Sequence, residues 1–258
     1  VGSSTALGTG TVTMADDTEI GFVADNLDLA NDLVLSGTED PTLNTHGNTA
    51  TWSGNISGTG ILTVNGSGTL ITKGSNSYSG ATNVVDNTTL QAGKADTFSA
   101  NSEHNIESGS TLALDGYSQT IAALSNSGTV DLHKLNSDDA GAILTVSGNY
   151  AGNNGKLIVN TVWNTDSSTS DKLVINGDAS GSTTVSTPNG IIGNVVQTNA
   201  QIYSADVVTI AGTDSSDTTF TGSAQTTNAG EAQLVKKDAN TYAWTLYAKS
   251  SDDDNSGS

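Results

Sequence analysis

The segment from Ser53 to Gly93 reads SGNISGTGILTVNGSGTLITKGSNSYSGATNVVDNTTLQAG, and its pattern predicts the fold. Short aliphatic groups such as Leu62/Val64 and Leu70/Ile71 alternate with Gly, Ser, Thr and Asn, and no segment shows a helical period. Short strands separated by tight turns cannot bury one apolar face alone, so successive windings must stack on one another. The pattern therefore predicts an all-β fold, a parallel β-helix.

The aliphatic positions recur at intervals close to twenty residues. Leu62 and Val84 lie 22 positions apart, as do Leu90 and Leu112, whereas Leu112 and Val130 lie 18 apart. At roughly 20 to 22 residues per coil, the chain predicts about 11 or 12 coils in a rod on the order of 50 Å long. Burying three aliphatic side chains contributes about 5–9 kcal/mol per coil. Ordering the coil costs more than that, so we expect no single coil to fold alone.

The spacing changes near residue 141. Leu144 and Leu157 are only 13 positions apart, and the string AILTVSGNYAGNNGKLIVNTVW from Ala142 to Trp163 looks like antiparallel hairpins. The segment Tyr242–Tyr247 alternates at period two with large rings, which suits a strand that covers the end of a solenoid. We therefore predict β-helix coils over 1–140, a hairpin-rich cap over 141–250 and a disordered linker over 251–258.

Charge and composition exclude several classes of function. The 258 residues carry a net charge of −19, and all eight basic residues are Lys, which disfavours binding to nucleic acid or to anionic membranes. There is no Cys for a disulfide or a thiolate metal site. No apolar run approaches the ~20 residues that span a bilayer. The chain begins within the repeat pattern without a secretory signal, so we expect it to be part of a longer protein.

The polar residues form no recognisable catalytic pattern. His46, His104 and His133 are scattered without zinc-site spacing, and we expect them at the surface or in turns. Neither a Gly-x-Ser-x-Gly elbow nor the GDSGSP string of serine-protease passengers occurs. A Ser–His–Asp triad assembled across coils is the less favoured alternative. The sequence thus predicts no catalytic residue, no metal site and no cofactor.

Three further patterns have structural interpretations that we favour. The acidic pairs Asp16-Asp17 and Asp138-Asp139, and the run 252–254, suit solvated turns, because the chain has no Arg to complete a polysaccharide-cleaving site. The Gly-x-Gly strings at 58–60 and 66–68 precede no helix and so lack the element that a phosphate loop needs. Sugar platforms remain an alternative for the three Trp residues, but we expect them in the core or cap: Trp52, Trp163 and Trp244.

Two segments resemble passenger domains of the type V autotransporters of Gram-negative bacteria. Gly66–Gly93, GSGTLITKGSNSYSGATNVVDNTTLQAG, resembles the autotransporter-associated repeat, with a departure at Asn87-Thr88 where the repeat prefers Gly. Ala142–Val185 resembles the pertactin-like autochaperone region. The similarity lies in Leu-Thr-Val at 144–146, Gly-Asn-Tyr at 148–150, Ser-Asp-Lys-Leu-Val-Ile at 170–175 and Gly-Asp-Ala-Ser-Gly at 177–181. The final Tyr242-x-Trp244-x-Leu246 suits the last strand of the same region.

This resemblance covers about half of the chain and carries expectations about fold and function. It implies a right-handed β-helix, secretion through a C-terminal outer-membrane β-barrel and display on the surface of a Gram-negative cell. We expect a non-enzymatic adhesin whose partners are a second copy of itself, in aggregation and biofilm formation, or a host matrix protein or glycan. The alternatives are a structural stalk whose functional head precedes this chain, or a polysaccharide-acting β-helix enzyme. We further expect residues 141–250 to fold first and to template the coils before them.

Overall fold

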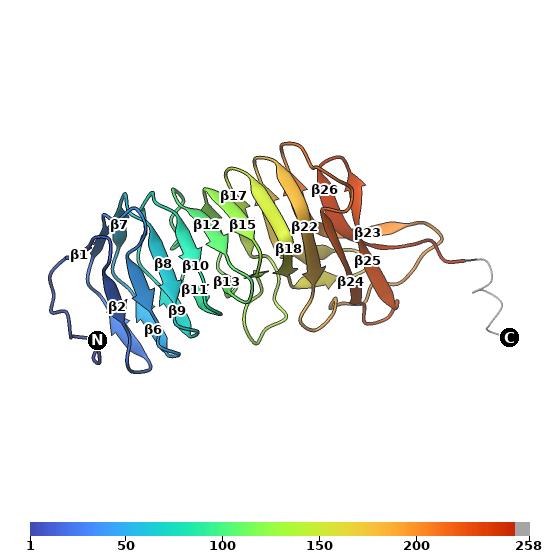
Figure 1. The fold of residues 1–258 in the computed structure, drawn as a ribbon. Helices are drawn as coiled ribbons and strands as arrows, with labels where there is room; N and C mark the ends of the chain where they lie inside the picture. Colours follow the sequence, from blue (N-terminus) through green and yellow to red (C-terminus); the bar gives the residue numbers. More distant parts are fainter. Residues whose placement is uncertain (251–258) are drawn as a thin grey trace.

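The computed structural model describes residues 1–250 as an elongated stack of β-strands with 26 strands and no helix (Figure 1). Nearly all strands pair in parallel with a strand of the next winding, so the chain circles one core repeatedly. This all-β, mostly parallel arrangement agrees with the expected solenoid. The predicted linker at 251–258 lies outside the described residues. Nothing in the described part forms a helix of the length and apolarity that crossing a bilayer requires.

The windings have three faces, each a parallel ladder. The first face contains β2 (Glu19–Gly21), β5 (Thr42–Asn44), β8 (Leu62–Asn65), β10 (Thr82–Val84), β12 (Glu103–Ile106), β15 (Ala123–Asn126) and the first parts of β18 (Tyr150–Ile158) and β22 (Ala179–Ser186). The second face contains β3 (Leu27–Leu29), β6 (Thr49–Trp52), β9 (Thr69–Thr72), β11 (Thr89–Ala92), β13 (Thr111–Ala113), β16 (Thr129–Asp131), the second parts of β18 and β22, and β24 (Phe220–Gln225).

The third face is regular at the two ends of the stack. Its strands are β1 (Val12–Met14), β4 (Leu33–Leu35) and β7 (Ile56–Gly58), and later β14 (Gln119–Ile121), β17 (Ile143–Val146), β21 (Lys172–Ile175) and β23 (Ile202–Ile210). The remaining strands are β19 (Thr161–Trp163), β20 (Ser168–Ser170), β25 (Glu231–Asp238) and β26 (Thr241–Leu246). These four make the antiparallel pairs, with β23 and β24 as partners at the C-terminal end.

The core is a column of aliphatic side chains, one layer per winding. On the second face Leu70, Leu90, Leu112 and Val130 align directly and are at most 1% exposed. The Thr residue that precedes each of them points outward, as the period-two alternation of a strand requires. Each layer leaves an apolar edge that only the next layer covers, so neighbouring coils depend on one another for stability.

The observed register confirms some of the expected spacings and corrects others. Leu90 pairs with Leu112 and Leu112 with Val130, as predicted. Leu62 pairs with Thr82 rather than Val84. The partner of Val84 is Val64, so the spacing between these two windings is 20 residues and not 22. Along the second face the described residues contribute nine strands, fewer than the 11 or 12 coils expected. The reason is that later coils lengthen: Leu144 pairs with Leu173, 29 residues on.

The prediction of antiparallel hairpins from Ala142 to Trp163 is wrong for most of that string. β17 and β18 pair in parallel with windings on both sides, and these ladders run across residue 140 without a break. The close spacing arises because β18 is long and serves two faces in one strand. Within the string from Ala142 to Trp163, only the last three residues, which form β19, enter an antiparallel pair, with β20. The division of the chain at residue 141 stays a prediction.

Candidate functional site: the closing C-terminal sheet

The C-terminal end of the stack is closed by an antiparallel sheet (Figure 1). β26 pairs with β23 of the third face, β25 pairs with β24 of the second face, and β25 and β26 pair with each other. The sheet therefore passes from one face to another across the end of the core. All six residues of β26 are buried. A solenoid end that would otherwise present an apolar layer and free backbone groups is covered in this way.

Large rings fill the space beneath this sheet. Phe220 lies between Tyr150 and Tyr242, with ring centroids 5.3 Å and 5.2 Å away, respectively. Trp244 is fully buried, and its indole Nε1–H donates to the Thr161 hydroxyl at 3.0 Å. Thr161 lies 83 residues earlier, so the last strand is tied to the β19–β20 hairpin as well as to its neighbours. Rings of this size contribute much of the buried area that holds such an end together.

A polar network anchors the closing sheet to the loop before β24. The Asp214 carboxylate, whose side chain is 1% exposed, accepts the Tyr242 hydroxyl at 2.5 Å and the Thr219 hydroxyl at 2.5 Å, and pairs with Lys236 Nζ at 3.1 Å. Burial works against ionisation, but the two hydroxyls and the Lys236 ammonium hold the pKa of Asp214 below its usual value. Burial, reinforced by the Asp214 charge, raises the pKa of Tyr242.

A second buried carboxylate, Asp171, explains the Ser-Asp-Lys string of the sequence. It is 1% exposed and accepts backbone N–H groups from Gly141, Ala142 and Asn160, at 2.9, 2.9 and 2.7 Å. Burial raises its pKa despite these donors. The Asn160 side chain extends the network to the carbonyl groups of residues 137 and 139. Asp171 thereby joins the loop before β17 to the β19–β20 hairpin.

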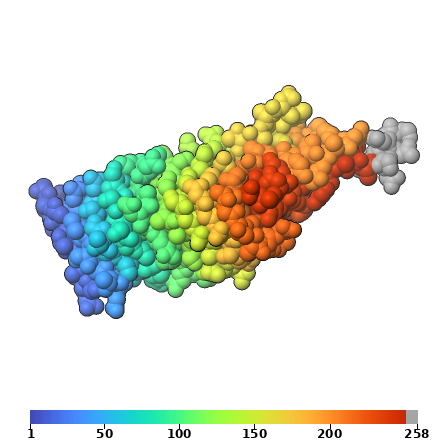
Figure 2. Space-filling model, turned by 90° about the horizontal axis from the view of Figure 1, so that it is seen from above, coloured from blue at the N-terminus to red at the C-terminus, as the bar shows by residue number. Residues whose placement is uncertain are grey.

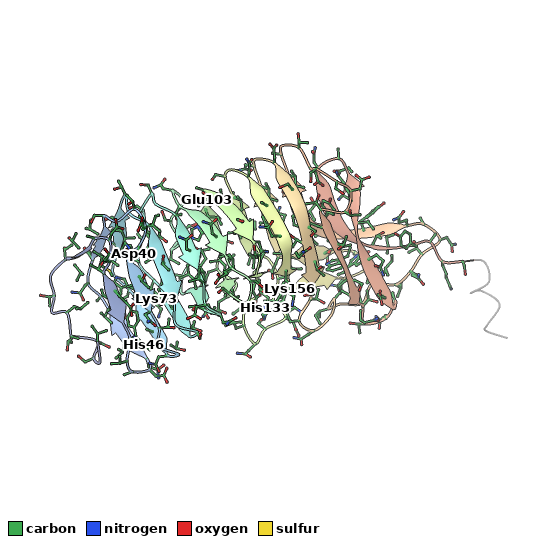
Figure 3. The ribbon with its side chains drawn as sticks, in the orientation of Figure 1. Asp40, His46, Lys73, Glu103, His133 and Lys156 are labelled. Carbon is green, nitrogen blue, oxygen red and sulfur yellow. The ribbon has the colours of Figure 1, made fainter. Side chains whose placement is uncertain are left out.

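The three histidines have three different environments, and none takes part in a metal cluster. Within the described residues, no group of three or more His, Cys, Asp or Glu side chains could hold a metal ion. His46 and His133 lie in turns, as expected, on well-separated coils (Figure 3). The expectation is wrong for His104, which is fully buried in β12 against Phe98, with only Nδ1 bonded, to the Ser102 carbonyl. Desolvation lowers the pKa of His104 to about 4.

The other sequence candidates have structural roles. Asp16, Asp17, Asp138 and Asp139 are exposed, and the run 252–254 lies outside the described residues. Trp52, Trp163 and Trp244 are all buried, at 0%, 4% and 0% exposure, which confirms the prediction of core or cap packing. The acidic and basic side chains labelled in Figure 3 are distributed along the rod.

The glycines of the Gly-x-Gly strings mark close approaches between coils. A Cβ on Gly58, whose φ is +100°, would lie 2.3 Å from the Leu35 carbonyl oxygen of the previous winding. Asn87, at the departure from the family repeat, adopts a left-handed φ of 52°. Asn tolerates that conformation better than most side chains with a Cβ.

Comparison with known proteins agrees with this description of the C-terminal half. Residues 119–232 match the family model described as Autochaperone Domain Type 1. This part of the chain is an autotransporter autochaperone region. The matched residues include the Asp171 network, the β19–β20 hairpin, Asp214 and the first strands of the closing sheet. They end before β26, which the structure nevertheless places at the centre of that sheet.

Several curated relatives resemble parts of the chain. The uncharacterized protein YuaQ of Escherichia coli (strain K12) is 41% identical over 146 residues, which cover 55% of this chain and 10% of that protein. The adhesin BmaC autotransporter of Brucella suis biovar 1 is 40% identical over 100 residues, which cover 38% of this chain and 3% of that protein. The uncharacterized Escherichia coli protein YdeU is 45% identical over 49 residues, 19% of this chain and 10% of that protein. The chain thus spans a tenth or less of these relatives.

Sequence reasoning identified the closing strand but not the groups that hold it. Asp214 lies in a polar Thr-Asp-Ser-Ser-Asp string that has the composition of a solvated loop. Its partners Tyr242 and Lys236 are 28 and 22 residues away, and no local spacing connects them. The only local signal is that lysine is scarce in this chain, with eight residues in 258, and two of them, Lys236 and Lys237, lie a few residues before the aromatic strand.

Proposed function

We propose that the chain is the C-terminal part of a surface-displayed adhesin passenger, and that its segment 141–250 folds first and templates the coils before it. The proposal takes the stack to be a right-handed β-helix on the surface of a Gram-negative bacterium, joined in the full-length protein to an outer-membrane β-barrel. The observation that carries the order of folding is the difference between the two ends. The C-terminal end has an antiparallel sheet of consecutive strands, whereas β1, β2 and β3 each pair in parallel with one strand of the next winding, and the segment before them contacts that end without forming a strand.

The physical reason for the order of folding is the cost of the first winding. A coil in the middle of the stack gains its energy only from neighbours that already exist. The C-terminal segment, by contrast, contains antiparallel pairs between consecutive strands, β24 with β25 and β25 with β26. Hairpins of this kind close short loops, so they form with less loss of chain entropy than parallel pairs that are 18 or more residues apart.

Pulse-labelling hydrogen exchange during refolding of the whole chain tests this order directly. The chain is diluted from denaturant, labelled at increasing times and digested into peptides. We expect amide protection to appear first in 141–250 and to spread toward residue 1. Protection that appears first in the coils of 1–140, or simultaneously throughout, would contradict the templating role. Deleting 141–250 should also leave the remaining coils sensitive to protease.

The adhesive role is supported by the adhesin relative and by the long lateral surface of polar side chains. A cell-settling assay tests this adhesive role, with the chain displayed on cells as part of a longer passenger. We expect faster settling than for cells that display an unrelated passenger of similar length, if copies associate through this surface. Unchanged settling, together with no binding to immobilised matrix proteins, would favour the stalk alternative. The folding experiment is independent of either result.

A further inference from the structure

A groove of about 470 Å³ lies beside the projecting β19–β20 hairpin, on the outer side of the third face. Figure 2 shows residues near 165, coloured yellow, standing out from the side of the rod. Five strands contribute residues to the lining of the groove: β17, β20, β21, β23 and β25. The groove is thus built by segments from distant parts of the sequence, outside the core and the closing sheet.

The charge of this groove is opposite to that of the molecule. Its lining contains two lysines, Lys172 and Lys237, and one acid, Asp206, in a chain whose net charge is −19. Lys237 Nζ pairs with Asp206 at 2.8 Å. The Lys172 ammonium has no hydrogen bond or ion pair with any described residue. The neighbouring hollow of about 560 Å³ differs, because its lysine, Lys236, is paired with Asp214 and Asp217.

The remaining polar groups of the lining are mostly acceptors for hydroxyl groups of a ligand. The hydroxyls of Ser168 and Ser204 donate to the carbonyls of residues 162 and 205, and each accepts one backbone N–H. A hydroxyl oxygen has two lone pairs, so each can accept one further bond. Thr169 is exposed, and its hydroxyl has no partner among the described residues. The groove therefore combines an unpaired cation with several hydroxyl oxygens.

An extended peptide does not suit the same groove. A peptide strand would need free backbone groups along β20 or β23. The edge donor of β23 that faces β20, the Ala205 N–H, already donates to Ser168 Oγ at 2.9 Å. The two strand edges are therefore bridged to each other. The chemistry that fits is a ligand with carboxylates for the lysines and hydroxyl groups for the serine oxygens.

We propose that this groove binds a carboxylate-bearing oligosaccharide of the uronic acid class, with a carboxylate on Lys172 and a second contact to Lys237. Charge-assisted bonds to an ammonium are the stronger contacts in such a site. The inference goes beyond the proposed function, because it concerns a lateral groove rather than the closing sheet. It holds whether or not the passenger causes cells to aggregate.

Calorimetric titration of the whole chain with trigalacturonate tests the proposal, with the neutral galactotriose as the uncharged comparison. We expect the acidic trisaccharide to bind, more weakly at higher salt, and the neutral one to bind at least about tenfold more weakly. Lys172→Gln should weaken binding by about tenfold or more, as expected for one lost charge-assisted contact. Lys156→Gln is the matched control, because Lys156 is an exposed lysine on β18 outside the groove.

The possible results distinguish loss of ligand binding in the groove from loss of folding. No binding of trigalacturonate at millimolar concentration overturns the proposal, as does equal binding of galactotriose or an equal effect of the Lys172 and Lys156 variants. Tighter binding of a hexaglutamate peptide than of the saccharide would overturn the assignment to a sugar. Circular dichroism melts of the two lysine variants should match the parent chain. The folding proposal stands or fails by its own experiment, whatever these titrations give.

Discussion

Two tryptophans at opposite ends of the stack provide the sharpest test of how this chain folds. Trp52 and Trp244 are both fully buried, and each donates one indole hydrogen bond, to the Asn31 carbonyl at 2.9 Å and to the Thr161 hydroxyl at 3.0 Å. Replacing a buried Trp with Ala costs about 3–5 kcal/mol. We therefore expect Trp52→Ala and Trp244→Ala to lower the free energy of unfolding by similar amounts.

Their effects on folding kinetics should differ. If the closing sheet is largely formed in the transition state, about 70% of a ~4 kcal/mol loss appears in the folding rate, which slows Trp244→Ala about a hundredfold. Trp52→Ala should instead fold at nearly the parent rate and unfold faster, because its coil is added late. Stopped-flow far-ultraviolet circular dichroism suits both variants, since each removes a fluorophore.

Two kinetic results would contradict folding that starts at the C-terminal end. Equal slowing of folding in the two variants would mean that the transition state spans the whole stack. Slowing confined to Trp52→Ala would place the nucleus at the N-terminal coils and refute the reasoning. Either result would leave the architecture unchanged and remove the templating role from residues 141–250.

Two further predictions concern the interior of the stack. Because the pKa of His104 is lowered to about 4 from 6.5, the unfolded chain binds more protons between these values, so stability falls as pH drops from about 6.5 to 4, by about 3 kcal/mol in total. His104→Phe should flatten this part of a plot of urea midpoint against pH. Asp171, whose pKa is raised, contributes with the opposite sign in both chains. An unchanged plot would show that His104 does not cause the slope. Gly181 has a φ of +80°, and a Cβ there would lie 1.8 Å from the Gly152 carbonyl oxygen. Gly181→Ala should therefore lower the free energy of unfolding by at least about 1–3 kcal/mol. Urea denaturation measures this loss, and Ser180→Ala, at an exposed neighbouring position, is the control. A loss no larger than that of the control would contradict the close contact.

Much of the fold follows from local pattern. The alternation of aliphatic and turn residues predicted strands and stacked windings, because a short two-sided strand has no other way to bury its apolar side. The pairings of Leu90 with Leu112 and Leu112 with Val130 follow from the same spacing. The closing role of the aromatic strand was also visible, since bulky side chains alternating at period two suit a strand that covers the open end of a solenoid. Hairpins after Ala142 were wrongly expected, because spacing cannot distinguish a short coil from one long strand that serves two faces.

Local sequence patterns were enough to predict that this chain stacks windings, shows no recognisable catalytic pattern and resembles an autotransporter passenger. These conclusions rest on composition and on spacings of about twenty residues or fewer, which a chain carries wherever it folds. Three contacts emerge only from the folded arrangement: Asp214 bonds to Tyr242 and Lys236, Trp244 reaches Thr161 across 83 residues, and Lys172 faces a groove with no partner among the described residues. Such contacts depend on which windings become neighbours and on how each loop lengthens its coil, and distance along the chain does not encode either.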